Sequence, residues 1–374
     1  MAPTGIAILG AGIFAKEAHL PAIAALGSDI ASLNAVYSRS IGSASQLAKD
    51  AQETLKLTEA PSVYHDGDES ANLDVLLARS DIQAVVVVLP ITLQPAIVLK
   101  ALAAGKHVLS EKPVAPDVSK GLALIMEYTE SYKAKALIWR IAENWEVEPG
   151  YHAAAKIISS GKIGKLTSFN VRAVGHVPKD SKWYKTPWRT VPDYQGGFLL
   201  DGGVHTIAAL RVMLPSPMVS LSGYASLNME HLPPHDTLNT TVRSADGSHG
   251  IVEMSFGAPV PSRAQEAKNG ISITGTEGWL WIENTKSEAG VQVIRITTKR
   301  VVRNEKGEDV GEEQDVVEER SCGVEKELRS FFAAVGGNDD GFGTPSGALK
   351  DVAWIQAALT SNGNPVDLAN LVQQ

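Results

Sequence analysis

The first part of the chain alternates between short apolar runs and longer runs with helical spacing. The apolar runs have the length of buried strands: IAIL (6–9), SLNAVYS (32–38), AVVVVLP (84–90) and HVLSEK (107–112). Strands that alternate with helices in this way form a parallel, doubly wound sheet. We therefore expect an α/β domain over residues 1–145.

From about residue 149 the pattern changes to longer runs with strand character. A helical run that ends at Gly161 comes first, and the strand-like runs after it are joined by short turns. Turn pairs such as Asp246-Gly247 indicate a mostly antiparallel sheet. We expect residues 146–374 to form an α+β substrate-binding and oligomerisation domain on a large open sheet. Within it, the charged tract 304–320 is interpreted as a solvated hairpin.

A glycine-rich turn follows the first strand, with the order Gly10-Ala11-Gly12-Ile13-Phe14-Ala15. In a dinucleotide fingerprint the first glycine makes the tight turn, the second admits the pyrophosphate, and the third small residue lets helix and strand pack closely. Such turns also occur without a ligand, but the strand–helix alternation here favours a Rossmann dinucleotide-binding domain. The motif predicts cofactor contacts from five residues: Gly10, Gly12, Ile13, Phe14 and Ala15.

The end of the second strand indicates which dinucleotide binds. Binding of NAD usually requires an acidic residue there, to hold the ribose 2′-hydroxyl. This chain has Ser38-Arg39 instead, and an arginine can bind a 2′-phosphate through a charge-assisted fork. A solvated surface arginine is the alternative. We expect Ser38 and Arg39 to contact the cofactor and NADP(H) to be preferred over NAD(H).

The run GKHVLSEKPVAP places Glu111-Lys112-Pro113 at the carboxyl end of a strand. Ligands of open α/β sheets bind at that edge, and Pro113 keeps Lys112 out of the helical region. An ordinary loop lysine is the alternative, but this position favours a functional one. Further cofactor contacts are expected from six residues at this edge: Leu89, Pro90, Gln94, Glu111, Lys112 and Asn144.

A second glycine-rich run, GGFLLDGGVHTIAAL, contains one carboxylate, Asp201, and one imidazole, His205, a helical turn apart. The apolar residues that follow indicate a buried helix, in which an imidazole needs a partner, and the glycines leave room for a ligand or another backbone. The alternative is structural, with Asp201 as a helix cap. We expect both residues to be catalytic, since an aspartate can cap a helix and still face a cleft.

The loop DSKWYKTPWRT (180–190) crowds aromatic residues beside an arginine just before this motif. Such a set suits a sugar ring or a carboxamide, and a packed loop anchor is the alternative. Substrate contacts are therefore expected from Glu143, Tyr184, Trp188 and Arg189, together with Lys112, Asp201 and His205. His19 and His176 are interpreted as structural or peripheral to the site.

Composition narrows the class of protein. The 374 residues carry a net charge of −8, which argues against nucleic acid or an anionic membrane as a partner. A single cysteine, Cys322, excludes a disulfide framework and a thiolate-rich metal site. The pairs His231/His235 and Asp201/His205 have no further clustered ligands, so no metal is expected. No apolar run reaches the ~20 residues of a membrane span, and no basic leader precedes the first strand. We expect a cytoplasmic protein.

Taken together, these motifs resemble the glucose–fructose oxidoreductase/inositol dehydrogenase/MocA family of pyridine-nucleotide oxidoreductases over nearly the whole chain. The similarity rests on three runs: GAGIFAKEAHLPAI, LSEKPVAP and GGFLLDGGVHTIAAL. The crossover segment AENWEVEPGYHAAAKIISSGKIGKL and the last two helical runs resemble the family as well.

The resemblance implies hydride transfer between a nicotinamide and a hydroxyl or carbonyl carbon of a sugar, polyol or related small molecule. It places Lys112 beside the reacting carbon, with Asp201 and His205 completing the site, and it implies a homodimer or homotetramer. The chain departs from the family pattern at Ala208, where an acid is common, and at Trp145, where an arginine is common. Two alternatives remain open: a dinucleotide-sensing regulatory protein, and a reductase of a non-carbohydrate carbonyl, imine or dihydrodiol.

Overall fold

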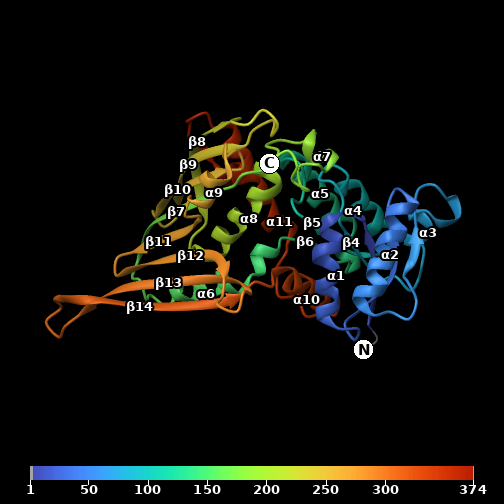
Figure 1. Ribbon diagram of the computed structural model, residues 1–374, viewed down its shortest axis with the longest axis horizontal. Helices are drawn as coiled ribbons and strands as arrows, with labels where there is room; N and C mark the ends of the chain where they lie inside the picture. The colour runs from blue at the N-terminus through green and yellow to red at the C-terminus, as the bar shows by residue number, and fades with distance from the viewer. Residues whose placement is uncertain (1–2, 374) are drawn as a thin grey trace. The chain divides into compact units, whose positions relative to one another are not determined.

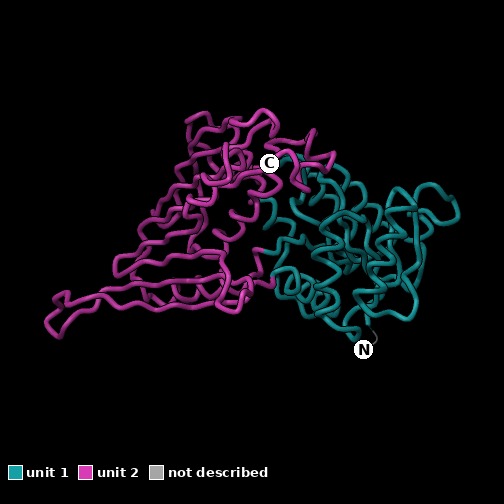
Figure 2. Tube along the Cα trace, viewed as in Figure 1, with its two compact units in different colours: residues 1–144, 323–349 teal, residues 145–322, 350–374 magenta. Residues whose placement is uncertain are grey.

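The computed structural model describes residues 3–373, and the ends of the two predicted domains at residues 1 and 374 lie outside that range. The chain forms two compact units (Figure 2). The first contains the residues up to Asn144 together with Gly323–Leu349, and the second contains Trp145–Cys322 and the residues from Lys350 onward.

The first unit is built on a six-stranded sheet in the order β3-β2-β1-β4-β5-β6. All its strand pairs are parallel, and chain order reverses between β1 and β4. The strands are β1 (Thr4–Leu9), β2 (Ala31–Tyr37), β3 (Ser62–Tyr64), β4 (Ala84–Val87), β5 (His107–Glu111) and β6 (Trp139–Ala142). This topology confirms the predicted Rossmann-type doubly wound sheet.

Helices connect these strands. They are η1 (Ala15–His19, a π-helix), α1 (Leu20–Leu26), α2 (Ile41–Leu55), η2 (Glu69–Ala71), α3 (Leu73–Leu77), α4 (Gln94–Ala103), α5 (Val118–Ser131) and η3 (Lys133–Lys135). Polar residues begin the longest two: the Ser40 hydroxyl accepts a hydrogen bond from the Ser43 N–H in α2, and Asp117 accepts one from the Lys120 N–H in α5. Both are ordinary N-caps that satisfy otherwise unpaired helix donors.

Helix α10 (Gly323–Val335) also belongs to the first unit, which differs from the domain boundaries drawn from the sequence. Its buried side chains Leu328, Phe331 and Phe332 join the core formed by β1, α1 and α2. The chain therefore returns to the nucleotide-binding unit near its end. Spacing within α10 indicates an amphipathic helix, but it does not indicate which unit that apolar face packs on.

The second unit contains a nine-stranded sheet in the order β14-β13-β12-β11-β7-β10-β9-β8-β15. Every pair is antiparallel except β10 with β7, which confirms the predicted open sheet. The strands are β7 (Leu166–Val174), β8 (Met218–Ser226), β9 (Thr237–Ser244), β10 (His249–Ser255), β11 (Gly270–Gly275), β12 (Gly278–Lys286), β13 (Gln292–Arg303), β14 (Asp309–Arg320) and β15 (Val366–Asp367). The charged tract 304–320 forms the turn and second strand of the hairpin β13–β14, drawn in orange in Figure 1.

Helices α6 and α8 pack against each other and against this sheet (Figure 1). The remaining helices are η4 (Asn144–Val147), α6 (Pro149–Ser159), α7 (Pro187–Thr190), α8 (Phe198–Met213), α9 (Pro261–Gln265), α11 (Pro345–Thr360) and α12 (Leu368–Leu371). Among residues 3–373, no helix combines the length and the apolar character that a membrane span requires.

Candidate active site

The candidate residues fall into two groups, one in each unit. In the first unit, the glycine-rich turn lies where the carboxyl ends of β1 and β4 meet. Gly10 has φ of +117°, and a Cβ there would lie 2.0 Å from the carbonyl oxygen of Val88. Ala15 is fully buried. At Gly12, by contrast, apart from Gly12 itself and its two chain neighbours, no heavy atom of the described chain lies within 4 Å of the place a Cβ would take. A tight turn, an open approach and a buried small residue are what a pyrophosphate site needs.

Arg39 follows β2 as an exposed residue and forms no ion pair with another residue in the described range. Its neighbour Ser38 uses its backbone N–H to bond the carbonyl of Tyr64. Asp66 accepts a 2.6 Å hydrogen bond from the hydroxyl of Tyr37, the last residue of β2. Burial, and then this bond, raise the pKa of Tyr37 above its usual range. The position of Arg39 leaves its guanidinium available to a ligand.

Gln94 is the first residue of α4 and is 2% exposed. Neither Nε2 nor Oε1 of its side chain has a hydrogen-bond partner within residues 3–373. Because a buried amide without partners is costly, such a group commonly serves a bound ligand. Leu89 and Pro90 precede it at the same sheet edge and are half-buried. Contact of these three residues with a cofactor stays a prediction.

Lys112 follows the last residue of β5. Glu111 pairs in register with Ala142 of β6, so Glu143, the next residue of the neighbouring chain segment, reaches the same sheet edge as Lys112. The side chain of Glu143 is buried, and Asn144 begins η4. The Lys112–Pro113 peptide bond is cis. Lys112 and Glu143 therefore share the ligand-binding edge of the sheet with the glycine-rich turn.

In the second unit, the helix with the second glycine-rich motif begins earlier than a cap at Asp201 would require. Helix α8 starts at Phe198, and its N-cap is Gly197, with φ of +53°. A Cβ at Gly197 would lie 2.5 Å from the carbonyl oxygen of Pro233. Asp201 consequently lies in the first turn, where a carboxylate suits the helix dipole, and its side chain is available for another partner.

Gly202 and Gly203 are packed against protein. A Cβ at Gly202 would lie 2.7 Å from the ring of Phe256, and one at Gly203 would lie 2.5 Å from the sulfur of Met254. The sequence left two interpretations for these glycines, room for a ligand or room for another part of the chain. The second is correct at Gly202 and Gly203, because protein side chains fill the space beside them. The small residues bring α8 close to the sheet and so fix the height of Asp201 and His205 above it.

Gly202→Ala is therefore expected to destabilise the fold by about 1–3 kcal/mol, because an aromatic ring cannot bend away as a methionine can. Urea unfolding would measure the loss. Gly42→Ala is the matched control: it lies in helix α2 with no heavy atom within 4 Å of its Cβ position, so a gain of about 0.5–1 kcal/mol is expected. Equal stability of the two variants would contradict the close packing of α8.

Asp201 is paired with Arg189. The Arg189 Nε–H donates to Oδ2 of Asp201 over 2.7 Å, and the two side chains are 14% and 9% exposed. The guanidinium carbon lies 4.0 Å from the ring centre of Trp188 and 5.2 Å from that of Trp183. A cation against aromatic faces is held both by charge and by stacking. The structure thus brings together three residues predicted separately as substrate or catalytic contacts.

The pair also affects Tyr194. Burial, and then the charge of Asp201, raise the pKa of this phenol above its usual range, and its ring lies 5.9 Å from that of Trp188. Tyr194 therefore stays neutral and forms part of the wall behind the pair. Trp183 and Tyr194 are members of this site that the sequence analysis did not select, although Trp183 lies in the loop it singled out.

His205 stacks on Trp145, with ring centres 5.6 Å apart and an interplanar angle of 27°. Trp145 in turn lies against Tyr151, at 5.4 Å. The departure from the family pattern at position 145 thus has a structural consequence, because an indole covers one face of the candidate catalytic imidazole. Position 145 drew attention only as a departure, and no sequence signal linked it to His205.

Tyr184 packs edge-on against His231, with ring centres 5.2 Å apart, and its carbonyl accepts a hydrogen bond from the Thr190 hydroxyl. These contacts favour the loop-anchor interpretation for Tyr184. His176 is also structural here: its Nδ1 bonds the carbonyl of Ala258 over 2.7 Å. Within the described residues, one set of His, Cys, Asp or Glu side chains is close enough to hold a metal: His19, Glu111 and Glu327.

Comparison with known proteins assigns the chain to a family. A family model described as "Oxidoreductase family, NAD-binding Rossmann fold" matches residues 4–135. A second, described as "GFO/IDH/MocA C-terminal domain", matches residues 151–281. The two matches fall on the two units.

Individual relatives are similar to this chain over almost its whole length. The chain is 38% identical over 367 residues to Dehydrogenase FPY6 of Fusarium mangiferae, covering 96% of each chain. It is 25% identical to 1,5-anhydro-D-fructose reductase of Ensifer adhaerens, covering 94% of this chain and 92% of that one. The crystal structure of an oxidoreductase from Thermotoga maritima is similar, with a TM-score of 0.79, 30% identity and 99% of both chains covered. Because the fold, both family matches and these relatives agree, the chain belongs to the GFO/IDH/MocA family of oxidoreductases with an NAD(P)-binding Rossmann domain.

Proposed function

We propose that this protein is an NADP(H)-dependent oxidoreductase that acts on a hydroxyl or carbonyl carbon of a sugar, polyol or related small molecule. The observation that carries the proposal is the position of Lys112 in the first unit. Its cationic side chain follows a buried strand at the same sheet edge as the open turn at Gly12. An ammonium group at the ligand-binding edge of a dinucleotide fold suits a reaction in which charge develops on a substrate oxygen.

The first unit supplies the groups that would hold the dinucleotide. The turn from Gly10 to Ala15 would take the pyrophosphate, and the Gln94 amide has hydrogen-bonding capacity that nothing else in the described chain uses. When bound, the nicotinamide accepts or supplies the hydride at its C4 atom. The protein's own groups have to bind the substrate, orient it and move one proton.

Two side chains are suited to move that proton and to stabilise charge on the substrate oxygen. Lys112 Nζ, as an ammonium, donates a hydrogen bond to the substrate oxygen and stabilises negative charge on it. An imidazole can both accept and donate a proton, so His205 takes the proton from the hydroxyl in oxidation and returns it in reduction. The stack on Trp145 fixes the plane of that ring. Arg189 holds Asp201 in place on α8, the helix that also carries His205.

The preference for NADP(H) is supported by Arg39, which is exposed after β2 and has no ion-pair partner in the described chain. Arg39→Ala is expected to weaken NADP(H) binding by about 10- to 100-fold, since a hydrogen bond to a charged group contributes about 1.5–3 kcal/mol. NAD(H) binding should change little, because it has no 2′-phosphate. Fluorescence titration of the reduced dinucleotides would measure both.

Arg243→Ala is the control for that experiment, since Arg243 is exposed on β9 of the second unit. It should leave both affinities unchanged. If Arg39→Ala weakens NADH and NADPH equally, Arg39 does not read the 2′-phosphate and the preference for NADP(H) is wrong.

A sugar or polyol substrate is supported by the group around Arg189. The Nη atoms of Arg189 make no hydrogen bond within residues 3–373, and aromatic rings lie beside them. Guanidinium donors next to indole faces suit a polyhydroxy compound. One face of Trp188 is already covered by Arg189, so a sugar ring would have to use another surface. The similarity to a relative named 1,5-anhydro-D-fructose reductase also supports a sugar or polyol substrate.

The test is absorbance at the reduced-nicotinamide band. The protein would be incubated with NADP⁺ and a panel of aldoses and polyols, and with NADPH and a panel of keto-sugars and dicarbonyls, with NAD(H) in parallel. Turnover with NADP(H) would establish the reaction and identify the substrate class. Tight NADPH binding without turnover of any compound, including imines and dihydrodiols, would contradict the oxidoreductase and favour a dinucleotide sensor.

A further inference from the structure

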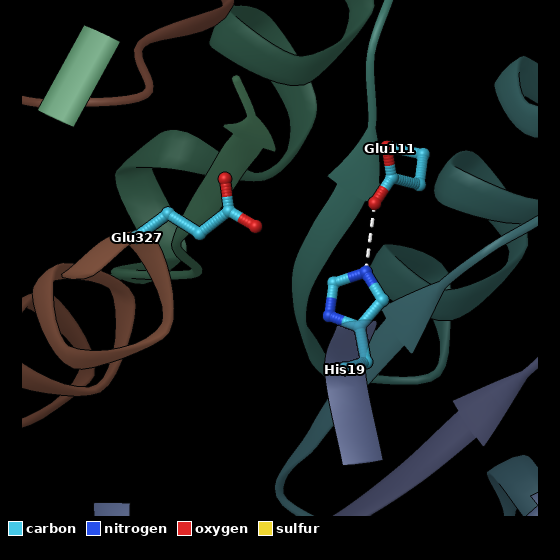
Figure 3. Close-up of side chains that lie close together, drawn as sticks. All are labelled: His19, Glu111 and Glu327. Carbon is cyan, nitrogen blue, oxygen red and sulfur yellow. Dashed lines mark hydrogen bonds and ion pairs between the residues drawn. The ribbon is translucent and has the colours of Figure 1, made fainter. Parts of the chain in front are cut away.

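Three buried ionisable side chains of the first unit come together from distant parts of the chain (Figure 3). His19 ends the π-helix η1, Glu111 ends β5, and Glu327 lies in α10. One nitrogen or oxygen atom from each lies within 4.8 Å of the others. His19 is 0% exposed, Glu327 5% and Glu111 8%. We call these three residues the His19 cluster.

Within the cluster, the imidazole bonds one carboxylate directly. Nε2 of His19 lies 2.7 Å from Oε1 of Glu111 (Figure 3). Nδ1 of His19 is buried and has no hydrogen-bond partner in the described chain. A hydrogen on Nδ1 would therefore be a buried donor without an acceptor, which is costly. The geometry favours the neutral tautomer with its hydrogen on Nε2, so that the imidazole donates to the Glu111 carboxylate.

A cation bridging His19 and Glu111 is not required by this geometry. The 2.7 Å separation of Nε2 and Oε1 is a direct hydrogen bond. Glu327 supplies a second buried carboxyl group, with an oxygen within 4.8 Å of the other two side chains.

His19 also contacts the glycine-rich turn. The ring of Phe14 lies edge-on to the imidazole, with centres 5.4 Å apart and an interplanar angle of 83°. Between these two residues the helix is a π-helix over Ala15–His19. Single π-turns are rare and are frequently found at functional sites. The imidazole is thus in contact with Phe14 of the dinucleotide motif on one side and bonded to Glu111 on another.

Glu111 precedes Lys112 in the chain. A hydrogen bond that fixes the Glu111 side chain also limits the rotation of the backbone from which Lys112 starts. Two segments 92 residues apart, the turn that would hold the pyrophosphate and the segment that carries Lys112, are therefore joined through one imidazole.

We propose that His19 is a positioning residue: through its Nε2–H bond to Glu111 it holds Lys112 in register with the dinucleotide-binding turn. The inference rests on the proposed function for the role of Lys112, and it assigns a role to a histidine interpreted from sequence as structural or peripheral. His19 itself touches neither substrate nor cofactor in this scheme. Its loss should affect the placement of the lysine more than the binding of the dinucleotide.

Two substitutions of the full-length protein separate this role from simple packing. His19→Leu keeps the bulk of the side chain and removes the donor, whereas His19→Gln keeps an N–H at a similar reach. His19→Leu is expected to lower kcat at least tenfold at an almost unchanged affinity for NADPH, since a misplaced reacting group alone costs about 10²-fold. His19→Gln is expected to restore most of kcat.

His107→Leu is the matched control. His107 begins the same strand, β5, at the opposite sheet edge, and its Nδ1 accepts a hydrogen bond from the Ile138 N–H. It should lose stability in urea as His19→Leu does, without the loss of kcat. Equal kcat in His19→Leu and wild type, equal losses in both leucine variants, or no rescue by glutamine would each overturn the proposal. So would a loss of kcat on chelation that Zn²⁺ or Mn²⁺ restores, because the His19 cluster would then be a metal site.

A second readout keeps the inference testable if the proposed function fails and no substrate is turned over. The rate at which an amine-acylating reagent modifies Lys112, followed by mass spectrometry with and without NADPH, reports the surroundings of Nζ directly. His19→Leu should change this rate for Lys112 and leave that of the exposed Lys120 unchanged. An unchanged Lys112 rate would overturn the positioning role whatever the reaction is.

Discussion

Lys112→Met is expected to lower turnover by about 10²–10⁴-fold, the usual effect of removing a group that assists proton transfer or stabilises charge. Methionine keeps the length of the side chain and removes its charge and its donors. Affinity for NADPH should fall much less than turnover, since the open turn at Gly12 and Arg39 belong to other segments. Stopped-flow absorbance and fluorescence titration would measure the two quantities.

Lys112→Arg distinguishes the two chemical roles that a lysine can have here. Arginine keeps the positive charge and the donors, but it does not release a proton in a protein. If Lys112 polarises the substrate oxygen as a cation, the arginine variant should keep more activity than the methionine variant. If both are equally inactive, Lys112 moves the proton itself, and His205 has another role.

Lys120→Met is the control for both variants. Lys120 lies in α5, its side chain is 63% exposed, and it pairs with Asp117, three residues earlier in the chain. Its removal should leave turnover unchanged. Wild-type turnover in Lys112→Met would contradict the proposed site, because no other cation has been placed at the carboxyl end of β5.

The first sheet and its nucleotide motif could be predicted from sequence because their signals are local. The apolar run of each strand, the glycine order and the triplet Glu111-Lys112-Pro113 each lie within a dozen residues, and family resemblance reinforced them. The same holds for the antiparallel sheet, whose strands follow one another through short turns.

Contacts between distant segments could not be predicted in this way. The sequence carries no periodicity that links His19 to Glu111, or Trp145 to His205, since each pair is more than 50 residues apart. Arg189 and Asp201 are closer in sequence, but their pairing depends on where α8 begins. Two consecutive glycines with positive φ, Gly196 and Gly197, start that helix before Asp201. A pair of glycines before an apolar run was the available signal, and it was interpreted as room for a ligand or another backbone.

The ion pairs of α8 connect the stability of the second unit with its candidate chemistry. Arg211, in the last turn of that helix, donates from Nε and Nη2 to both oxygens of Asp351 at 3.0 and 2.9 Å, and from Nη1 to Glu146 at 3.0 Å. Asp351 is 1% exposed and Glu146 5%. Glu146 is the neighbour of Trp145, which stacks on His205. The guanidinium therefore ties the segment that covers the imidazole to the helix that carries it.

Arg211→Met is expected to destabilise the second unit by about 3–5 kcal/mol, because it leaves two buried carboxylates without their cation. Replacing one of those carboxylates as well, in Arg211→Met/Asp351→Asn, should recover part of the loss, since only one uncompensated charge then stays buried. Urea unfolding followed by tryptophan fluorescence would measure both.

Arg300→Met is the matched control, in which the same substitution removes an exposed ion pair. Arg300 bonds Glu313 across the hairpin β13–β14, and the two side chains are 43% and 40% exposed. Water already solvates both charges there, so a loss of about 0–1 kcal/mol is expected. If Arg211→Met cost no more than Arg300→Met, the buried carboxylates would have found protons or water in place of the arginine. The segment from Glu146 to His205 would then have to be held by packing alone, and the Trp145 stack should survive the substitution intact.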